Sequence, residues 1–161
     1  MSEGRRSAGA RERFLAGAEA LGLTPEILRF PEGTRTAEQA AAAVGCELGQ
    51  IVKSLVFLCG GEPVLALTSG ANRVDTTRLG DLLGGAISRA DADGVREATG
   101  YAIGGTPPFG HAQPLRAVID RALLAYDTVW AAAGTPDTVF ELTPDELVQA
   151  SGAEAADFAA D

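Results

Sequence analysis

One lysine lies within an otherwise apolar segment, where a charged side chain needs a partner. Lys53 is the only lysine of the chain, between Ile51-Val52 and Ser54-Leu55-Val56-Phe57. Since alternate residues on both sides are apolar, the segment has the pattern of a strand buried on both faces. A buried ammonium group needs an anionic or polar partner, which a substrate phosphate or carbonyl would supply. The competing interpretation is a solvated lysine on the surface of a sheet.

A second candidate for chemistry is a loop at residues 104–111, Gly-Gly-Thr-Pro-Pro-Phe-Gly-His. Gly104 and Gly105 permit positive φ and a close approach of the backbone to a ligand, while Pro107 and Pro108 stiffen the second half of the loop. Such a loop can aim two backbone N–H groups in a fixed direction, as an oxyanion hole requires, and one well-aimed donor contributes about a hundred- to a thousand-fold in rate. The alternative is an ordinary rigid turn, although such turns need fewer glycines and prolines.

The other polar candidates also have structural explanations. His111 is the single histidine, and because no serine or cysteine motif of hydrolase type accompanies it, a structural role ranks first. Asp120 lies at the end of a predicted strand, where it either orients a pocket group or caps the next turn. No His, Cys, Asp or Glu cluster has ligand spacing, and no Gly-x-Gly-x-x-Gly fingerprint follows a strand, so we expect neither a metal nor a cofactor.

The charge balance limits the kinds of partner. The formal net charge is −9, which argues against a broad electrostatic grip on a phosphate backbone, DNA included. A partner held by its end would need only a few basic residues near a pocket. The available basic side chains include Arg5, Arg6, Arg11, Arg13, Arg35, Lys53, Arg73 and Arg78.

Localisation signals are lacking in the sequence. No apolar run approaches the roughly 20 residues that span a bilayer, and no signal-peptide stretch follows the N-terminal arginines. The two cysteines, Cys46 and Cys59, form no disulfide framework. We therefore expect a cytoplasmic protein without a membrane partner.

Periodicity and cap residues predict the elements that would position these side chains. The predicted helices are residues 7–21, a helix capped by Thr36 and Gln39 that ends at Gly45, residues 74–83, residues 91–99, and one from Thr143 to Gly152. The predicted strands are residues 26–30, 51–59, 64–68, 117–120, 128–132 and 138–142. This order predicts one α+β domain over residues 1–161, with a mixed, largely antiparallel sheet flanked by helices. Residues 1–6 are expected to form a flexible tail.

These motifs occur together, and in this order, in a known family. The segments are Val52-Lys53-Ser54-Leu55-Val56-Phe57, Arg73-Val74-Asp75, residues 99–110, Ile119-Asp120, and an apolar strand ending in Gly134. Over roughly residues 34–157, the chain resembles the YbaK/ProX-like superfamily of aminoacyl-tRNA deacylases. Its free-standing members remove wrong amino acids from tRNA, commonly proline tRNA. The same fold is an editing insertion in bacterial prolyl-tRNA synthetases.

The resemblance implies a role for each matching position. The family's pocket lysine falls on Lys53, where it would bind the terminal phosphate or ribose region. The family's Gly-x-x-x-Pro element falls on Gly104 to Pro108, whose amides would hold the aminoacyl carbonyl while water attacks. The implied catalytic residues are Lys53, Gly104 and Gly105, and the implied substrate-binding residues are Arg35, Thr36, Arg73, Thr106, Pro107, Pro108, His111 and Asp120. The implied partners are the acceptor end of an aminoacyl-tRNA and prolyl-tRNA synthetase.

The identity of the amino acid removed is narrowed by one departure from the family. Cysteine-specific members have polar residues near Gly134, where this chain has Ala132, Ala133 and Val139. A small aliphatic or hydroxyl-bearing residue is therefore the expected substrate. Two other functions stay open: a non-catalytic module that binds an aminoacyl-tRNA or nucleotide end, and a hydrolase or binder for a small aminoacyl-like metabolite.

Overall fold

The computed structural model describes residues 3–34 and 36–161, with side chains from residue 9 onward. The helices are α1 (Glu3–Ala20), α2 (Ala37–Val44), α3 (Thr76–Leu83), α4 (Ala92–Thr99) and α5 (Pro144–Ser151), with short 3₁₀ turns η1 (Leu48–Gln50) and η2 (Arg121–Ala125). The strands are β1 (Leu28–Arg29), β2 (Val52–Cys59), β3 (Glu62–Ser69), β4 (Ile87–Arg89), β5 (Arg116–Asp120), β6 (Val129–Ala132), β7 (Thr138–Leu142) and β8 (Glu154–Ala156).

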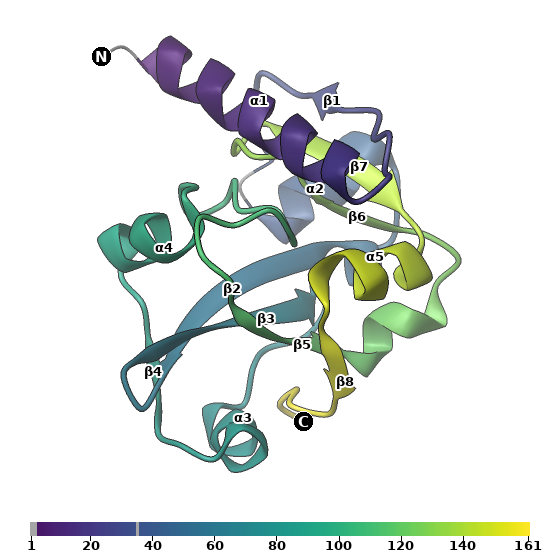
Figure 1. Cartoon of the computed structure of the whole chain (residues 1–161). Coiled ribbons are helices and arrows are strands. Elements are labelled where there is room, and N and C mark those ends of the chain that lie inside the picture. The colour runs from purple at the N-terminus through teal and green to yellow at the C-terminus, as the bar shows by residue number, and fades with distance from the viewer. Residues whose placement is uncertain (1–2, 35) are drawn as a thin grey trace.

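The strands form two sheets, as Figure 1 shows. The five-stranded sheet has the order β4-β2-β3-β5-β8 and is mixed, because β2 runs antiparallel to β3 and β4 whereas β5 runs parallel to β3 and β8. The smaller sheet, β1-β7-β6, is antiparallel. A bridge between Ile51 and Trp130 joins the two sheets at the start of β2. The predicted α+β class is confirmed, with two sheets in place of one.

Local sequence signals explain most helix ends. Thr36 and Gln39 exchange the reciprocal bonds of a capping box, and Gly45 ends α2 with a φ of 77°. The start of α3 moves to Thr76, because the Asp75 side chain accepts two backbone N–H groups as its N-cap. The backbone of residues 3–6 is helical, where the sequence predicted a tail, while residues 1 and 2 lie outside the described part.

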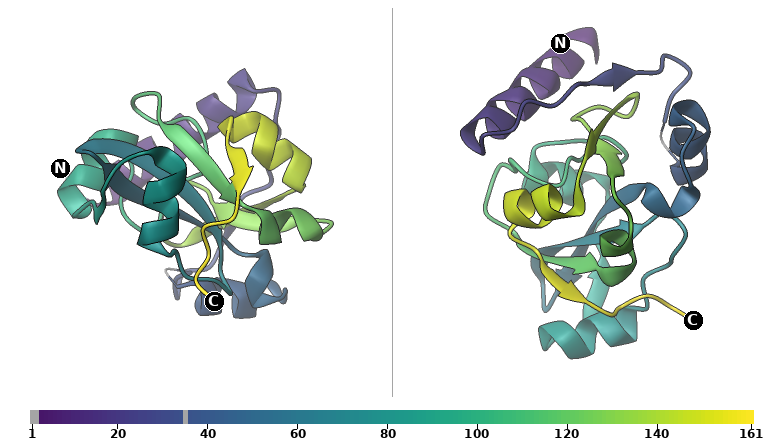
Figure 2. Two further views of the ribbon diagram at one scale, coloured as in Figure 1. Left: turned by 90° about the horizontal axis from the view of Figure 1, so that it is seen from below. Right: turned by 90° about the vertical axis from the view of Figure 1, so that its right-hand side faces the viewer.

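Both faces of the five-stranded sheet are covered, so the apolar residues of β2 serve two cores. Val52 and Val56 belong to the main core, together with residues of α1, α4, α5, β6 and β7. Phe57 faces the opposite way, into a second core that includes Leu79 and Leu83 of α3. Figure 2 shows α1 and α3 on opposite sides of this sheet. The alternating pattern read from the sequence therefore separates the two cores.

One edge of β2 is only partly covered. The strand β4 pairs with β2 at residues 57–59 alone, which leaves residues 52–56 beyond the reach of β4. This uncovered stretch, between β4 and the smaller sheet, is where the candidate site lies.

Candidate active site

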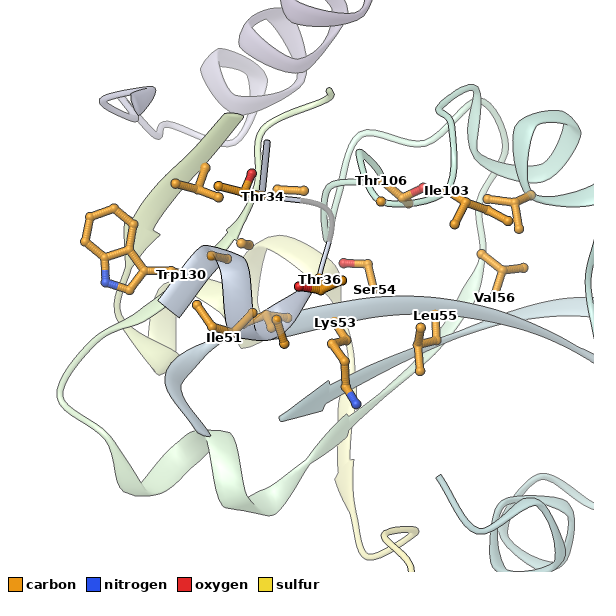
Figure 3. Close-up of a pocket in the computed structure, with 18 of the residues that line it drawn as sticks. Thr34, Thr36, Ile51, Lys53, Ser54, Leu55, Val56, Ile103, Thr106 and Trp130 are labelled. Carbon is orange, nitrogen blue, oxygen red and sulfur yellow. The ribbon is translucent and has the colours of Figure 1, made fainter. Parts of the chain in front are cut away.

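A pocket of about 380 Å³ lies along the uncovered edge of β2 (Figure 3). Such a volume suits a small organic ligand, since sites of this kind typically hold about 300–1,000 Å³. Its wall is built from α2, β2, the 103–106 loop, β6 and β7, with Arg89 and Ala90 at the β4 end. Segments distant in sequence therefore converge on one strand edge.

The backbone of β2 points polar groups toward this pocket. In an antiparallel pair, successive residues point their N–H and C=O groups alternately toward the partner strand and away from it. The Gly70 N–H donates to the Ile51 carbonyl at 2.7 Å, so odd-numbered residues pair with β3. The N–H and C=O groups of Ser54, which lies beyond the residues that pair with β4, consequently point to the outer edge. An extended ligand segment could bond this edge without any rearrangement of the sheet.

Lys53 lies at the pocket, but its side chain extends from the opposite face of β2 to Ser54 (Figure 3). Its ammonium group donates a 2.6 Å hydrogen bond to the Asn72 carbonyl. Burial lowers the pKa of Lys53 from its usual 10.5, with nearby Arg73 acting in the same direction against Glu38 and Asp120. The lysine therefore has a neutral partner at one side and can still receive an anion.

Asp120 supports the turn that holds Lys53 and does not itself line the pocket. Its carboxylate accepts from the Ser69 N–H at 3.1 Å and from the Asn72 side-chain amide at 2.9 Å. The other oxygen accepts from the Ala122 N–H and caps η2. Of the two roles left open by the sequence, the geometry matches the cap, and any effect on substrate passes through Asn72.

The glycine loop has a different arrangement of donors from the one predicted. Gly104 lines the pocket with a φ of 86°. The Gly105 N–H is already used, because it donates to the Ala102 carbonyl at 3.0 Å. A Cβ at Gly105 would lie 2.8 Å from the Thr135 backbone, so this glycine permits close packing. Within the described residues, the N–H groups of Gly104 and Thr106 have no hydrogen-bond partner, so both are available as donors, as is that of Ile103.

The rest of the loop is anchored below the pocket. Phe109 is 2% exposed and stacks on Phe14 of α1, with 5.4 Å between ring centroids. The His111 ring nitrogen Nε2 lies 2.7 Å from the Pro107 carbonyl oxygen. Burial lowers the pKa of His111, although its bond to Pro107 opposes this shift. His111 thus stabilises the conformation of the loop, and neither it nor the two prolines line the pocket.

The remaining predicted binding residues divide between the pocket and its surroundings. Thr36 lines the pocket, although its hydroxyl also accepts the capping bond from the Gln39 N–H. Arg73 is exposed and close enough to Lys53 to affect its pKa, but it is not part of the pocket wall. Arg35 lies outside the described residues.

Several residues of the pocket wall were not singled out from the sequence. They include Thr34, Ser54, Arg89, Ile103 and Trp130. Ser54 adjoins Lys53, and its polarity within an apolar strand was the available signal. Arg89 belongs to β4, a three-residue strand without a detectable sequence pattern. Trp130 reaches the pocket only because the two sheets meet.

Two negative findings apply to the part of the chain that the structure describes. Within it, no group of three or more His, Cys, Asp or Glu side chains could hold a metal ion. None of its helices has both the length and the hydropathy needed to cross a bilayer.

The comparisons with known proteins agree on one family. A model of the aminoacyl-tRNA editing domain matches residues 31–150. The uncharacterized protein YwhH of Bacillus subtilis strain 168 is 34% identical over 127 residues, which cover 78% of this chain and 81% of YwhH. A proline–tRNA ligase of Maridesulfovibrio salexigens is 36% identical over 108 residues, covering 66% of this chain and 18% of the ligase. The chain thus spans only a small part of that enzyme.

The fold agrees with these sequence matches. The crystal structure of a proposed trans-editing enzyme for prolyl-tRNA synthetase superposes with a TM-score of 0.90 and 46% sequence identity. The match covers 94% of this chain and 98% of that one.

Proposed function

Because the chain belongs to the aminoacyl-tRNA editing domain family, we propose that it hydrolyses the ester bond of a mischarged aminoacyl-tRNA. The observation that carries this proposal is that Lys53, Gly104 and Thr106 line one pocket at the edge of β2, with Lys53 extending from the face opposite to Ser54. A half-buried cation and two unpaired backbone donors are the groups needed to fix a phosphate or ribose and to stabilise a developing oxyanion.

The geometry supports separate roles for Lys53 and for the backbone amides of the loop. Lys53 holds the phosphate or ribose region of the terminal nucleotide, which fixes the acceptor end. The aminoacyl carbonyl oxygen points at the N–H groups of Gly104 and Thr106. Negative charge develops on this oxygen as the carbonyl carbon becomes tetrahedral, and fixed donors stabilise it without reorganisation.

Water is the nucleophile in this proposal. The described residues of the pocket wall include no cysteine, histidine, aspartate or glutamate. A water oxygen therefore attacks the ester carbonyl carbon and loses a proton, and the tetrahedral intermediate expels the ribose oxygen, which takes up a proton. The free amino acid and the uncharged tRNA leave the site.

Proline tRNA is the proposed carrier, and the chain acts on it in trans. The similarity to a proline–tRNA ligase and to a proposed trans-editing enzyme supports this assignment. Such an activity is needed because a synthetase site discriminates poorly between side chains that differ by one methylene, about 10- to 200-fold. The net charge of −9 suits a contact confined to the acceptor end.

The test is deacylation of proline tRNA carrying alanine, serine, threonine, cysteine, 2-aminobutyrate or proline, each assayed separately. The measured quantity is the rate of ester loss above buffer, with a Lys53→Ala variant in parallel. We expect one or two non-cognate residues to be removed, proline to be spared, and the variant to be slow. If no substrate is hydrolysed but charged tRNA still binds, the chain is a binding module instead.

A further inference from the structure

One hydroxyl in the pocket wall is left without a partner. The Ser54 Oγ atom is shielded from solvent, and it has no hydrogen-bond partner in the described structure. Buried hydroxyls almost always find a partner, because an unsatisfied polar group costs free energy, so an exception needs an explanation. Ser54 lies on the same face of β2 as Val52 and Val56, in otherwise apolar surroundings.

The other hydroxyls around this part of the pocket are already engaged. Thr34 Oγ1 donates to the Pro136 carbonyl at 3.0 Å, and Thr106 Oγ1 donates to the Ala102 carbonyl at 3.0 Å. The Thr36 hydroxyl accepts from the Gln39 N–H at 3.1 Å. Figure 3 shows Ser54 and Thr106, which line the same pocket as Thr36, on the side of β2 away from the Lys53 side chain. Ser54 thus differs from its neighbours in having both its donor and its acceptors free.

We propose that Ser54 is a specificity-determining residue that hydrogen-bonds a hydroxyl on the side chain of the bound aminoacyl group. The pocket then prefers seryl esters to alanyl esters. This inference rests on the proposed deacylase function and narrows its substrate class. A rotation about the single χ1 bond of Ser54 turns the hydroxyl toward an entering ligand.

The charges of the pocket wall favour a neutral hydroxyl over the substrate's ammonium group. The charged side chains in the described wall are Lys53 and Arg89, and both are cationic. An ammonium group beside Ser54 would find no carboxylate in the described wall to balance its charge, and Lys53 extends from the other face of β2. A hydroxyl carries no such cost. A substrate hydroxyl can also either donate a hydrogen bond to Ser54 or accept one from it.

Selectivity arises from the same hydroxyl. A site that hydrogen-bonds a substrate hydroxyl rejects the analogue that lacks it, because the protein group is then left unpaired. Alanine would leave the Ser54 hydroxyl buried and unsatisfied, as it is among the described residues. Serine would satisfy it.

The experiment compares seryl and alanyl esters of proline tRNA with the full chain, Ser54→Ala and Ser88→Ala. Ser88 is an exposed serine of the neighbouring strand β4 that does not line the pocket, so it is a matched control. We expect kcat/KM of the unaltered chain to favour the seryl ester about tenfold or more, as one hydrogen bond predicts. Ser54→Ala should abolish this preference by slowing seryl hydrolysis, with alanyl hydrolysis within about threefold. Ser88→Ala should change neither.

Two results would overturn the inference while leaving the deacylase function intact. One is equal hydrolysis of seryl and alanyl esters by the unaltered chain. The other is a parallel loss on both esters in Ser54→Ala, which would place Ser54 against a group common to all substrates.

A binding experiment distinguishes failure of this inference from failure of the proposed function. The probes are 3′-amino-3′-deoxyadenosine carrying serine or alanine in a stable amide bond, titrated by calorimetry. If no ester is hydrolysed, a preference for the seryl probe that Ser54→Ala removes would still support the inference. Equal affinity for the two probes, or no binding of either, would refute it.

Discussion

The ammonium group of Lys53 donates a 2.6 Å hydrogen bond to the main-chain carbonyl of Asn72. The Asn72 side chain in turn donates to the carboxylate of Asp120 at 2.9 Å. A residue at the end of β5 therefore fixes the turn that receives the lysine of β2. The position of the pocket cation thus depends on three separate segments.

Removing the Lys53 ammonium group should weaken binding of the acceptor end. A hydrogen bond to a charged group contributes about 1.5–3 kcal/mol, so Lys53→Ala should lower kcat/KM about 10- to 150-fold, mainly through KM. Lys53→Arg keeps the charge in a different geometry and should retain part of the activity. Steady-state kinetics with charged proline tRNA provides the measurement. Unchanged KM in Lys53→Ala would mean that the lysine does not hold the tRNA.

The same lysine predicts an alkaline limit to activity. Burial lowers the pKa of Lys53 below 10.5, so its charge is lost at a lower pH than that of an exposed lysine. Because kcat/KM reports groups of the free enzyme, it should decline as pH rises through this lowered pKa. The spontaneous alkaline hydrolysis of the ester is subtracted at each pH. Lys53→Arg, whose guanidinium stays charged, should lack the decline, and a decline of equal midpoint in that variant would assign it elsewhere.

Local signals in the sequence were sufficient for most elements near the site. The apolar runs at residues 51–59 and 64–68 predicted two strands, which pair as the β2–β3 hairpin with Cys59 opposite Glu62. The Thr36 capping box and the Gly45 stop predicted α2. These features depend on residues close in sequence, so one chain reveals them.

The pocket itself could not be predicted in this way, because it depends on long-range pairing. Ser54 faces the cavity since β4 stops short of it, and β4 gives no sequence signal. The Gly105 N–H was expected to be a catalytic donor, but within the turn it already donates a hydrogen bond to the Ala102 carbonyl. The glycines and prolines identified the loop in the sequence. Which of its backbone N–H groups stay free depends on the conformation of the folded loop.

Replacing Asp120 is predicted to lower the free energy of unfolding more than it affects catalysis. Asp120→Ala would leave the buried Ser69 N–H without its acceptor, at a cost of about 1–3 kcal/mol, and would remove the η2 cap, worth about 1 kcal/mol. Thermal unfolding followed by circular dichroism should show the lower midpoint. KM should also rise, since the Asn72 turn that holds Lys53 loosens. An unchanged melting temperature would contradict the structural role.

The aromatic contact between Phe14 and Phe109 links α1 to the 104–111 loop. Phe14 is fully buried and also lies 4.9 Å from Phe140, centroid to centroid. Phe14→Ala should cost about 3–5 kcal/mol, as cavity-forming substitutions of phenylalanine do. Chemical denaturation measures this loss. Phe14→Leu keeps most of the volume and should lose much less, so equal losses in the two variants would show that packing is not the cause.

Gly105 tests whether the loop must pack closely against Thr135. A Cβ at this position would lie 2.8 Å from the Thr135 Cα and carbonyl carbon, and backbone atoms cannot move aside cheaply. Gly105→Ala should therefore displace the loop and misdirect the Gly104 and Thr106 amides. A misplacement of about 1 Å can cost about a hundredfold in rate, so kcat should fall on that order with KM less affected. Gly9→Ala is the control, because a Cβ there meets nothing within 4 Å in a helix. Equal kcat values for the two variants would show that the loop amides are not the oxyanion donors.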